Sequence, residues 1–190
     1  MSHTNKKSVY DRSITEKKQV PLSTFSFLFS EMIQYIVTKH NEEKELDLEE
    51  KLTSLGYPIG EKILEWCFLL KEKSFKRKLK INDILIFIHN NVWQLLFGTQ
   101  ANGLQQSAED EDEYRIVEDN PLTNTHIFLS QNNPVNCASF FGGIIEGILN
   151  SADFRCKVST YFFDVENKRK TYYIIKFDKD VIERDKNMKG

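Results

Sequence analysis

The sequence predicts an α+β fold: N-terminal helices, then a ββαββ arrangement whose antiparallel sheet packs against the helices. Three observations predict it. Apolar residues recur at helical spacing through the first half of the chain. Runs rich in β-branched and aromatic residues, typical of strands, occupy the second half. A polar and then acidic segment, residues 99–113, separates the two halves and is expected to be a solvated loop.

Length and charge restrict the classes of protein to which the chain can belong. Its 190 residues suffice for one domain, expected over residues 21–187, after a polar and basic leader, residues 1–20, that is expected to be disordered. The net charge of −2 excludes a global positive field for nucleic acid. No run approaches the ~18 apolar residues that span a bilayer, so membrane contact is expected to be peripheral. Three cysteines without CxxC spacing indicate reduced thiols in the cytoplasm.

Three helices are predicted before the first charged connector. The first covers residues 25–38, with Ser23 as its N-cap. A short second helix ends at Gly56, which we expect in the left-handed conformation. Pro58 then begins a third helix that runs to about residue 71, because proline suits a first helical position.

A basic connector, residues 71–80, holds six Lys or Arg and leads into a fourth helix between Asn82, a suitable N-cap, and Gly98. Contact with anionic lipid headgroups, at ~1 kcal/mol per basic residue, is one interpretation of the connector, and a solvated loop is the other. The acidic residues 109–113 also fit plain solvation.

The second half is predicted to hold four strands around one helix. Turn chemistry at residues 119–121 separates the first two strands, and a charged turn at residues 166–170 joins the last two. The helix between the pairs covers residues 138–150, with Asn136 as its cap. The strands are expected at residues 114–118, 123–129, 156–165 and 171–177, and a final short helix at residues 180–186.

The first helix carries more apolar surface than one core can cover. Its apolar side chains span roughly 200° of a helical projection, whereas a helix lying on a single core needs a stripe only somewhat over ~100° wide. Phe27 even lies among the polar residues of the opposite side. The excess favours contact with another protein. The candidate interface residues on this helix are Phe25, Phe27, Phe29, Met32 and Ile33.

The fourth helix is apolar on two opposite sides, and such a helix is buried on both. Either neighbouring helices of the same chain cover both sides, or another subunit or an enclosed ligand covers one. The second side supplies three further candidate interface residues, Ile86, Trp93 and Phe97. The first side comprises Ile84, Leu85, Ile88, Val92, Leu95 and Leu96.

The predicted helix at residues 138–150 has a side of small residues, Ser139, Gly143 and Gly147. Each glycine costs up to ~1 kcal/mol of helix propensity, which is offset where another element approaches closely. A membrane dimerisation motif has the same spacing, but this segment is too short and contains Glu146. We interpret the small side as packing closely against the sheet.

No catalytic, cofactor-binding or metal site is predicted. The histidines have no partner at metal-ligand spacing, and a half-buried structural role is preferred over haem ligation for the one in the fourth helix. Glu61 and Glu65, one turn apart, are interpreted as solvated surface rather than as a carboxylate pair. The cysteines lack an activating base in the sequence. These residues are His3, His40, His89, His126, Cys67, Cys137 and Cys156.

Six segments share their order and near-matched spacing with one known family: PLSTFSFLFSEMIQY, LGYPIGEKILEW, IFIHNNVWQLLFG, YRIVEDNPLTNTHI, NCASFFGGIIEGIL and YYIIKFDKDVIERDKN. They resemble the small subunits of the transport protein particle, TRAPP, within its Bet-three branch. The resemblance extends over about residues 20 to 187.

The resemblance implies an α+β fold and pairing of subunits through their N-terminal helices into an elongated rod. It implies an architectural, non-enzymatic role, with other TRAPP small subunits as partners, chiefly the Bet-three namesake subunit in a heterodimer. The complex of this family tethers vesicles between the endoplasmic reticulum and the Golgi and promotes nucleotide exchange on a Rab GTPase. The link of this chain to the GTPase is therefore expected to be indirect, and its location cytoplasmic and peripheral at the cis-Golgi and the endoplasmic reticulum.

One departure from the family pattern concerns acylation. The namesake subunit carries an acylated cysteine between its third and fourth helices, whereas residues 73–78 here contain none. Cys67 lies one to two turns earlier, so the resemblance carries over neither acylation nor an acyl-chain channel. The alternative function is a binding module for an apolar small molecule or acyl chain on a similar fold.

Overall fold

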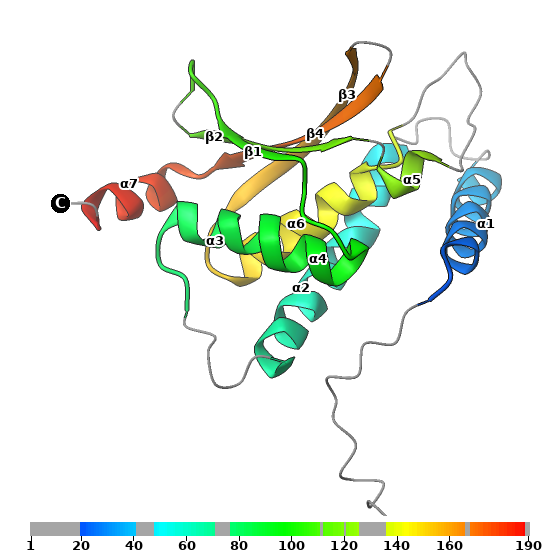
Figure 1. Ribbon diagram of the computed structural model, residues 1–190, viewed down its shortest axis with the longest axis horizontal. Coiled ribbons are helices and arrows are strands. Elements are labelled where there is room, and N and C mark those ends of the chain that lie inside the picture. The colour runs from blue at the N-terminus through cyan, green and yellow to red at the C-terminus, as the bar shows by residue number, and fades with distance from the viewer. Residues whose placement is uncertain are drawn as a thin grey trace, which may run out of the picture.

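The chain forms a four-stranded antiparallel sheet laid over a layer of helices (Figure 1). The computed structural model describes residues 20–40, 48–70, 77–110, 112–119, 121–125, 136–165 and 168–188. The predicted α+β class is confirmed. The predicted leader falls on residues 1–20, of which residues 1–19 lie outside the described part.

The helical elements precede and flank the sheet, whose strand order is β1-β2-β4-β3. The helices are α1 (Leu22–His40), α2 (Leu48–Leu70), α3 (Ile81–Phe87), a π-helical segment η2 (Ile88–Val92), α4 (Trp93–Phe97), α5 (Leu122–Thr125), α6 (Ser139–Ser151) and α7 (Lys179–Asn187). The strands are β1 (Gly103–Gln106), β2 (Glu113–Asp119), β3 (Cys156–Val165) and β4 (Lys168–Phe177).

Helix α2 corrects two predictions. Gly56 and Pro58 lie inside one continuous helix, so Gly56 is not a left-handed terminator and no new helix begins at Pro58. Tertiary contact explains why glycine lies inside this helix. A Cβ on Gly56 would lie 2.0 Å from the carbonyl oxygen of Phe140 on α6, and a Cβ on Gly60 would lie 2.2 Å from that of Ile144. Glycine is therefore required where α2 crosses α6.

On the small side of α6, Gly143 and Gly147 face α2 and not the sheet as predicted, whereas Ser139 Oγ lies 2.6 Å from Thr160 Oγ1 of β3. A Cβ on Gly143 would lie 2.0 Å from the Thr53 carbonyl oxygen, and a Cβ on Gly147 would lie 2.1 Å from that of Tyr57. The two helices thus meet through glycines from both partners. Every residue of α6 from Ser139 to Leu149 is buried, because α2 covers one side and the sheet another.

The fourth predicted helix is present as α3, η2 and α4 in sequence, and Gly98 ends it at φ 76°, as predicted. Asn82 is not its cap. The helix begins one residue earlier, and the Ile81 N–H donates to Asp185 Oδ1 of α7 at 2.9 Å. A side chain 104 residues away therefore satisfies a donor that local sequence was expected to satisfy.

Two further caps differ in detail from the predictions. Ser23 is wrong as a cap, since α1 begins at Leu22 and the carbonyl of Pro21 accepts from the N–H groups of Thr24 and Phe25. Asn136 is also wrong as the cap, since the N-cap of α6 is Ala138; the Asn136 Oδ1 accepts a hydrogen bond from the Ala138 N–H (3.2 Å) just before the helix.

The first half of the sheet also differs from its prediction. Strand β1 lies within the segment 99–113 that was expected to be a loop, and it pairs with β2. The strand predicted at residues 123–129 is wrong where it is described, because α5 occupies 122–125; residues 126–129 lie outside the described part. Strands β2, β3 and β4 confirm the other predictions, with β4 extending back over residues 168–170 of the expected turn.

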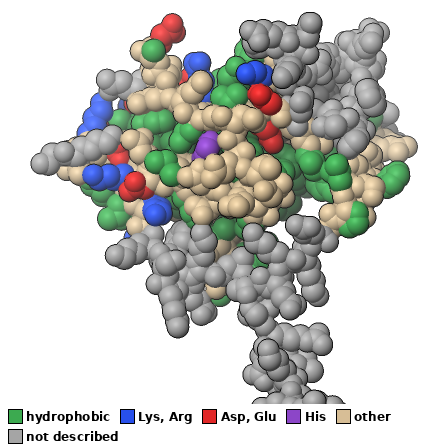
Figure 2. Space-filling model, in the orientation of Figure 1, with side chains coloured by type: hydrophobic (Ala, Val, Ile, Leu, Met, Phe, Trp, Pro, Cys, Tyr) green, Lys and Arg blue, Asp and Glu red, His purple; other side chains and the backbone are tan. Residues whose placement is uncertain are grey.

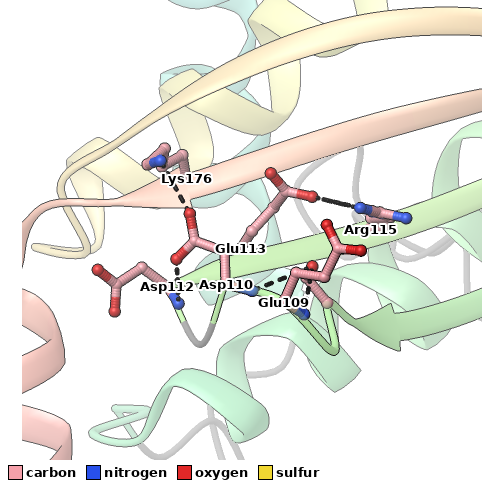
Figure 3. A network of polar contacts seen from close by, with 7 residues as sticks. Glu109, Asp110, Asp112, Glu113, Arg115 and Lys176 are labelled. Carbon is pink, nitrogen blue, oxygen red and sulfur yellow. Dashed lines mark hydrogen bonds and ion pairs between the residues drawn. The ribbon is translucent and has the colours of Figure 1, made fainter.

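The acidic residues before β2 form a turn that side-chain hydrogen bonds hold in place (Figure 3). Asp110 Oδ2 accepts from Lys176 Nζ of β4 at 2.9 Å, and Asp110 Oδ1 accepts from the Asp112 N–H. The hydrogen bond from Lys176 lowers the pKa of Asp110. Glu113 accepts from the Arg115 guanidinium at 2.7 Å. These contacts anchor the end of the β1–β2 connection to the neighbouring strand.

Candidate subunit interface

Helix α1 leaves three large apolar side chains mostly exposed. Phe27, Leu28 and Tyr35 are 75%, 71% and 62% exposed. The inner side is buried, with Phe29 stacked on Phe25 (ring centroids 5.5 Å apart) and in contact with Phe140 of α6 (5.3 Å). Hydrophobic side chains accordingly come to the surface at the α1 end of the molecule (Figure 2).

The residues predicted as an interface divide into three groups. Phe29, Ile33 and Trp93 belong to the core, each with no more than 3% of its surface exposed. Phe27 and Ile86 are exposed. The remaining three are partly buried against the core: Phe25, Met32 and Phe97.

The π-helical segment explains why Ile86 and Trp93 do not share a side. A uniform α-helix would place residues seven apart almost in line. Segment η2 lies between them and has i→i+5 hydrogen bonds. A π-helix rotates less per residue than an α-helix, so the side chains after η2 point in a different direction from the one that a uniform α-helix would give them. Trp93 consequently faces inward, where its ring contacts Tyr173 of β4 (5.5 Å) and Phe97 (5.6 Å).

The second half of α2 carries an exposed apolar stripe that is not among the predicted interface residues. Ile59, Trp66 and Leu69 are exposed, while Ile63 and Cys67 on the same helix are buried. The signal was present in the sequence, because these three residues share one helical face at spacings of seven and three.

The residues considered for chemistry occupy structural positions. All three cysteines are buried. Burial, with Glu49 nearby, raises the pKa of Cys137 to about 11, and burial also raises the pKa of Cys156. Neither thiol is therefore ionised at neutral pH. His89 Nδ1 lies 2.6 Å from Asn90 Oδ1, and the remaining histidine side chains lie outside the described residues.

The paired-carboxylate interpretation of Glu61 and Glu65 gains no support, because Lys62 Nζ lies 3.2 Å from Glu65 Oε2 in an exposed ion pair. Across the described ranges, no group of three or more His, Cys, Asp or Glu is placed to hold a metal ion. None of the helices in the described part is long and apolar enough to cross a membrane.

Of the basic connector, residues 71–76 lie outside the described part. Its remainder runs along the protein surface, where Arg77 forms an ion pair with Asp153 (3.5 Å). Neither interpretation of the connector is decided by this contact, so lipid contact stays a prediction.

Comparison with known proteins identifies the family. A family model described as "Transport protein particle (TRAPP) component" matches residues 25–178. Trafficking protein particle complex subunit 5 of Dictyostelium discoideum is 44% identical over 182 residues, which cover 94% of this chain and 96% of that protein. The subunit 5 of Homo sapiens is 33% identical over 187 residues, covering 97% and 95%.

A solved structure agrees at the level of the fold. A trafficking protein particle complex subunit 3 from Naegleria fowleri, covalently bound to palmitic acid, matches with a TM-score of 0.61 over 83% of this chain and 97% of that one, at 16% identity. The family model and the sequence relatives cover nearly all of the described helices and strands. The chain therefore belongs to the TRAPP component family, as its six ordered segments predicted.

Proposed function

We propose that the chain is an architectural, non-catalytic subunit of a TRAPP vesicle-tethering complex in transport between the endoplasmic reticulum and the Golgi. Nucleotide exchange on a Rab GTPase is then a property of the whole assembly, which this chain supports by holding neighbours in place. Its location is the cytoplasm and the periphery of the cis-Golgi and endoplasmic reticulum. The observation that carries the proposal is the exposure of Phe27 and Leu28 on α1.

The energetics favour a partner on this side of α1. Burying apolar surface is worth ~25 cal/mol per Å², so covering Phe27, Leu28 and Tyr35 together contributes several kcal/mol. A stable interface buries about 800 Å² per partner, which is more than one helix side provides. We propose that Ile86 and the α2 stripe make up part of the remainder, in this contact or in one with another neighbour.

The proposed partner on α1 is the Bet-three namesake subunit, in a heterodimer. Co-expression of the two chains, followed by size-exclusion chromatography with light scattering, tests this. A one-to-one complex that persists on dilution to about 1 μM is the expected result. A stable, monodisperse monomer that ignores the namesake subunit would overturn the proposal.

A further inference from the structure

Strand β3 lies at the edge of the sheet, with β4 on one side only. Alternate residues of an antiparallel edge strand direct their N–H and C=O groups away from the neighbour. Cys156 and Val158 belong to this outward series, because their N–H groups donate to side chains of α6 instead of to β4: Cys156 to Asn150 Oδ1 and Val158 to Glu146 Oε2, each at 2.9 Å. Thr160 is the next outward residue.

The hydrogen bonds between α6 side chains and the outward N–H groups of β3 stop before Thr160. Asn150 and Glu146 are one helical turn apart, and the next position in that row is Gly142, which has no side chain. A Cβ there would already lie 2.8 Å from Thr160 Cγ2, so no larger side chain fits. The Thr160 hydroxyl contacts Ser139 Oγ (2.6 Å), but no acceptor for its N–H lies among the residues that the structure describes.

The unprotected edge opens into a pocket of about 630 Å³ between β3 and the first half of α2. Consecutive residues from Lys157 to Tyr161 line it, so the pocket surrounds the strand edge and not just one face of the sheet. The opposite wall extends along α2 from Glu49 to Tyr57. These walls are about 12–13 Å long, the length of about four extended residues.

The charge of the pocket selects among occupants. Among the described residues that line it, Glu49, Glu50 and Glu146 are acidic and Lys157 is basic. Lys157 Nζ already lies 3.5 Å from Glu146 Oε1. The described lining residues thus carry a formal net charge of −2 (three Glu and one Lys), which favours a positively charged occupant.

We infer that the β3 edge at Thr160 binds an extended segment of a partner protein, with Lys or Arg facing α2, which adds to the sheet as a fifth strand. Main-chain hydrogen bonds to Thr160 supply affinity, and the glutamates of α2 supply selectivity, as in other cases of strand addition. This surface is separate from the apolar side of α1 and does not depend on the pairing proposed for it.

The test uses the full chain, labelled for NMR, and a blocked eight-residue peptide that alternates valine and lysine. We expect binding at or below about 1 mM, with the Thr160 amide protected from hydrogen exchange. Thr160→Pro removes the N–H without removing a bond to β4 and is expected to weaken binding by about tenfold. Thr160→Val is the matched control, since it loses the hydroxyl but keeps the N–H, and its affinity is expected to stay within about twofold of the parent.

Several results would overturn the inference. These are absence of binding at about 1 mM peptide, binding that leaves the Thr160 amide exchange unchanged, or equal affinity for a valine–glutamate peptide. If light scattering shows that Thr160→Pro converts a dimer of this chain into a monomer, the occupant is a second copy and the inference is wrong. Should the proline variant fail to fold in a thermal melt, the exchange of the Thr160 amide in the parent chain decides. A negative result in this experiment does not affect the proposed pairing through α1, because that pairing is measured separately with the namesake subunit.

Discussion

Gly56 of α2 and Phe140 of α6 lie in backbone contact: a Cβ on Gly56 would be 2.0 Å from the Phe140 carbonyl oxygen. The contact is reciprocal, since a Cβ on Gly143 of α6 would lie equally close to the Thr53 carbonyl of α2. No side chain fits between the two helices here. The crossing fixes the distance between α2 and the central helix, and with it the placement of the α2 stripe and of the pocket along β3.

Gly56→Ala is expected to destabilise the protein by up to about 2 kcal/mol. Backbone atoms cannot yield to the added methyl as a flexible side chain would, so the overpacking cost of about 1–3 kcal/mol exceeds the gain of up to ~1 kcal/mol in helix propensity. Urea unfolding measures the change. Gly103→Ala is the matched control, because its Cβ would meet Val117 at an ordinary 3.6 Å. Equal stability of the Gly56 variant and the parent would contradict the crossing geometry.

Phe27→Asp is expected to abolish pairing with the namesake subunit while leaving the thermal unfolding midpoint of the isolated chain within a few degrees of the parent. Its side chain is 75% exposed, so the charge disturbs a partner and not the core. Light scattering of the co-expressed chains measures pairing. Lys179→Asp places the same carboxylate at an exposed site on α7 and should pair normally.

Phe29→Asp provides the opposite case on the same helix. Its side chain is 3% exposed, and an unpaired carboxylate in that position should unfold the chain or detach α1. A Phe29 variant that folds like the parent in circular dichroism would show that α1 is not held by its inner side.

Glu118→Gln is expected to stabilise the protein at neutral pH. Glu118 is buried and accepts from the Tyr173 hydroxyl at 2.7 Å; burial raises its pKa, and that hydrogen bond only partly opposes the rise. The ionised carboxylate therefore destabilises the fold above the raised pKa, and the penalty disappears as pH falls below the unfolded value near 4.5. A glutamine keeps an acceptor without the charge.

Denaturant unfolding between pH 4 and 8 checks this prediction. The stability difference between the Glu118 variant and the parent should be largest at pH 7–8 and shrink toward about pH 4.5. A difference that grows on acidification would mean that the carboxylate is stabilised as an anion.

The three cysteines are expected to resist alkylation in the folded protein. Burial excludes the reagent, and the pKa of Cys137, about 11, keeps its thiol protonated at neutral pH. Mass spectrometry after iodoacetamide treatment should find unmodified chain without urea and three modifications in urea. Rapid modification of Cys67 alone under native conditions would show that the end of α2 opens.

The predictions that held depend on local periodicity. The first helix, the helix before β3 and strands β2, β3 and β4 were each marked by apolar spacing over many residues. The Gly98 terminus is also a local property, because a glycine can adopt φ 76° without steric cost. The family could be recognised for the same reason: its ordered segments coincide with these elements.

The predictions that failed depended on a local signal that a distant contact overrides. Gly56 and Pro58 are helix breakers in isolation, yet α2 continues through both because α6 packs against that turn. Strand β1 has no alternating pattern of its own and exists because β2 pairs with it.

Three properties could be predicted from the amino-acid sequence: the class of fold, the family and the excess of apolar surface on the first helix. Which of those apolar residues remain exposed depends on the packing of the folded chain. Burial depends on the elements that arrive from elsewhere in the chain: Phe140 covers Phe29, and the π-helical segment turns Trp93 toward Tyr173. A helical projection of one segment contains neither of these neighbours. It can therefore show how many apolar sides a helix has, but not which of them are buried.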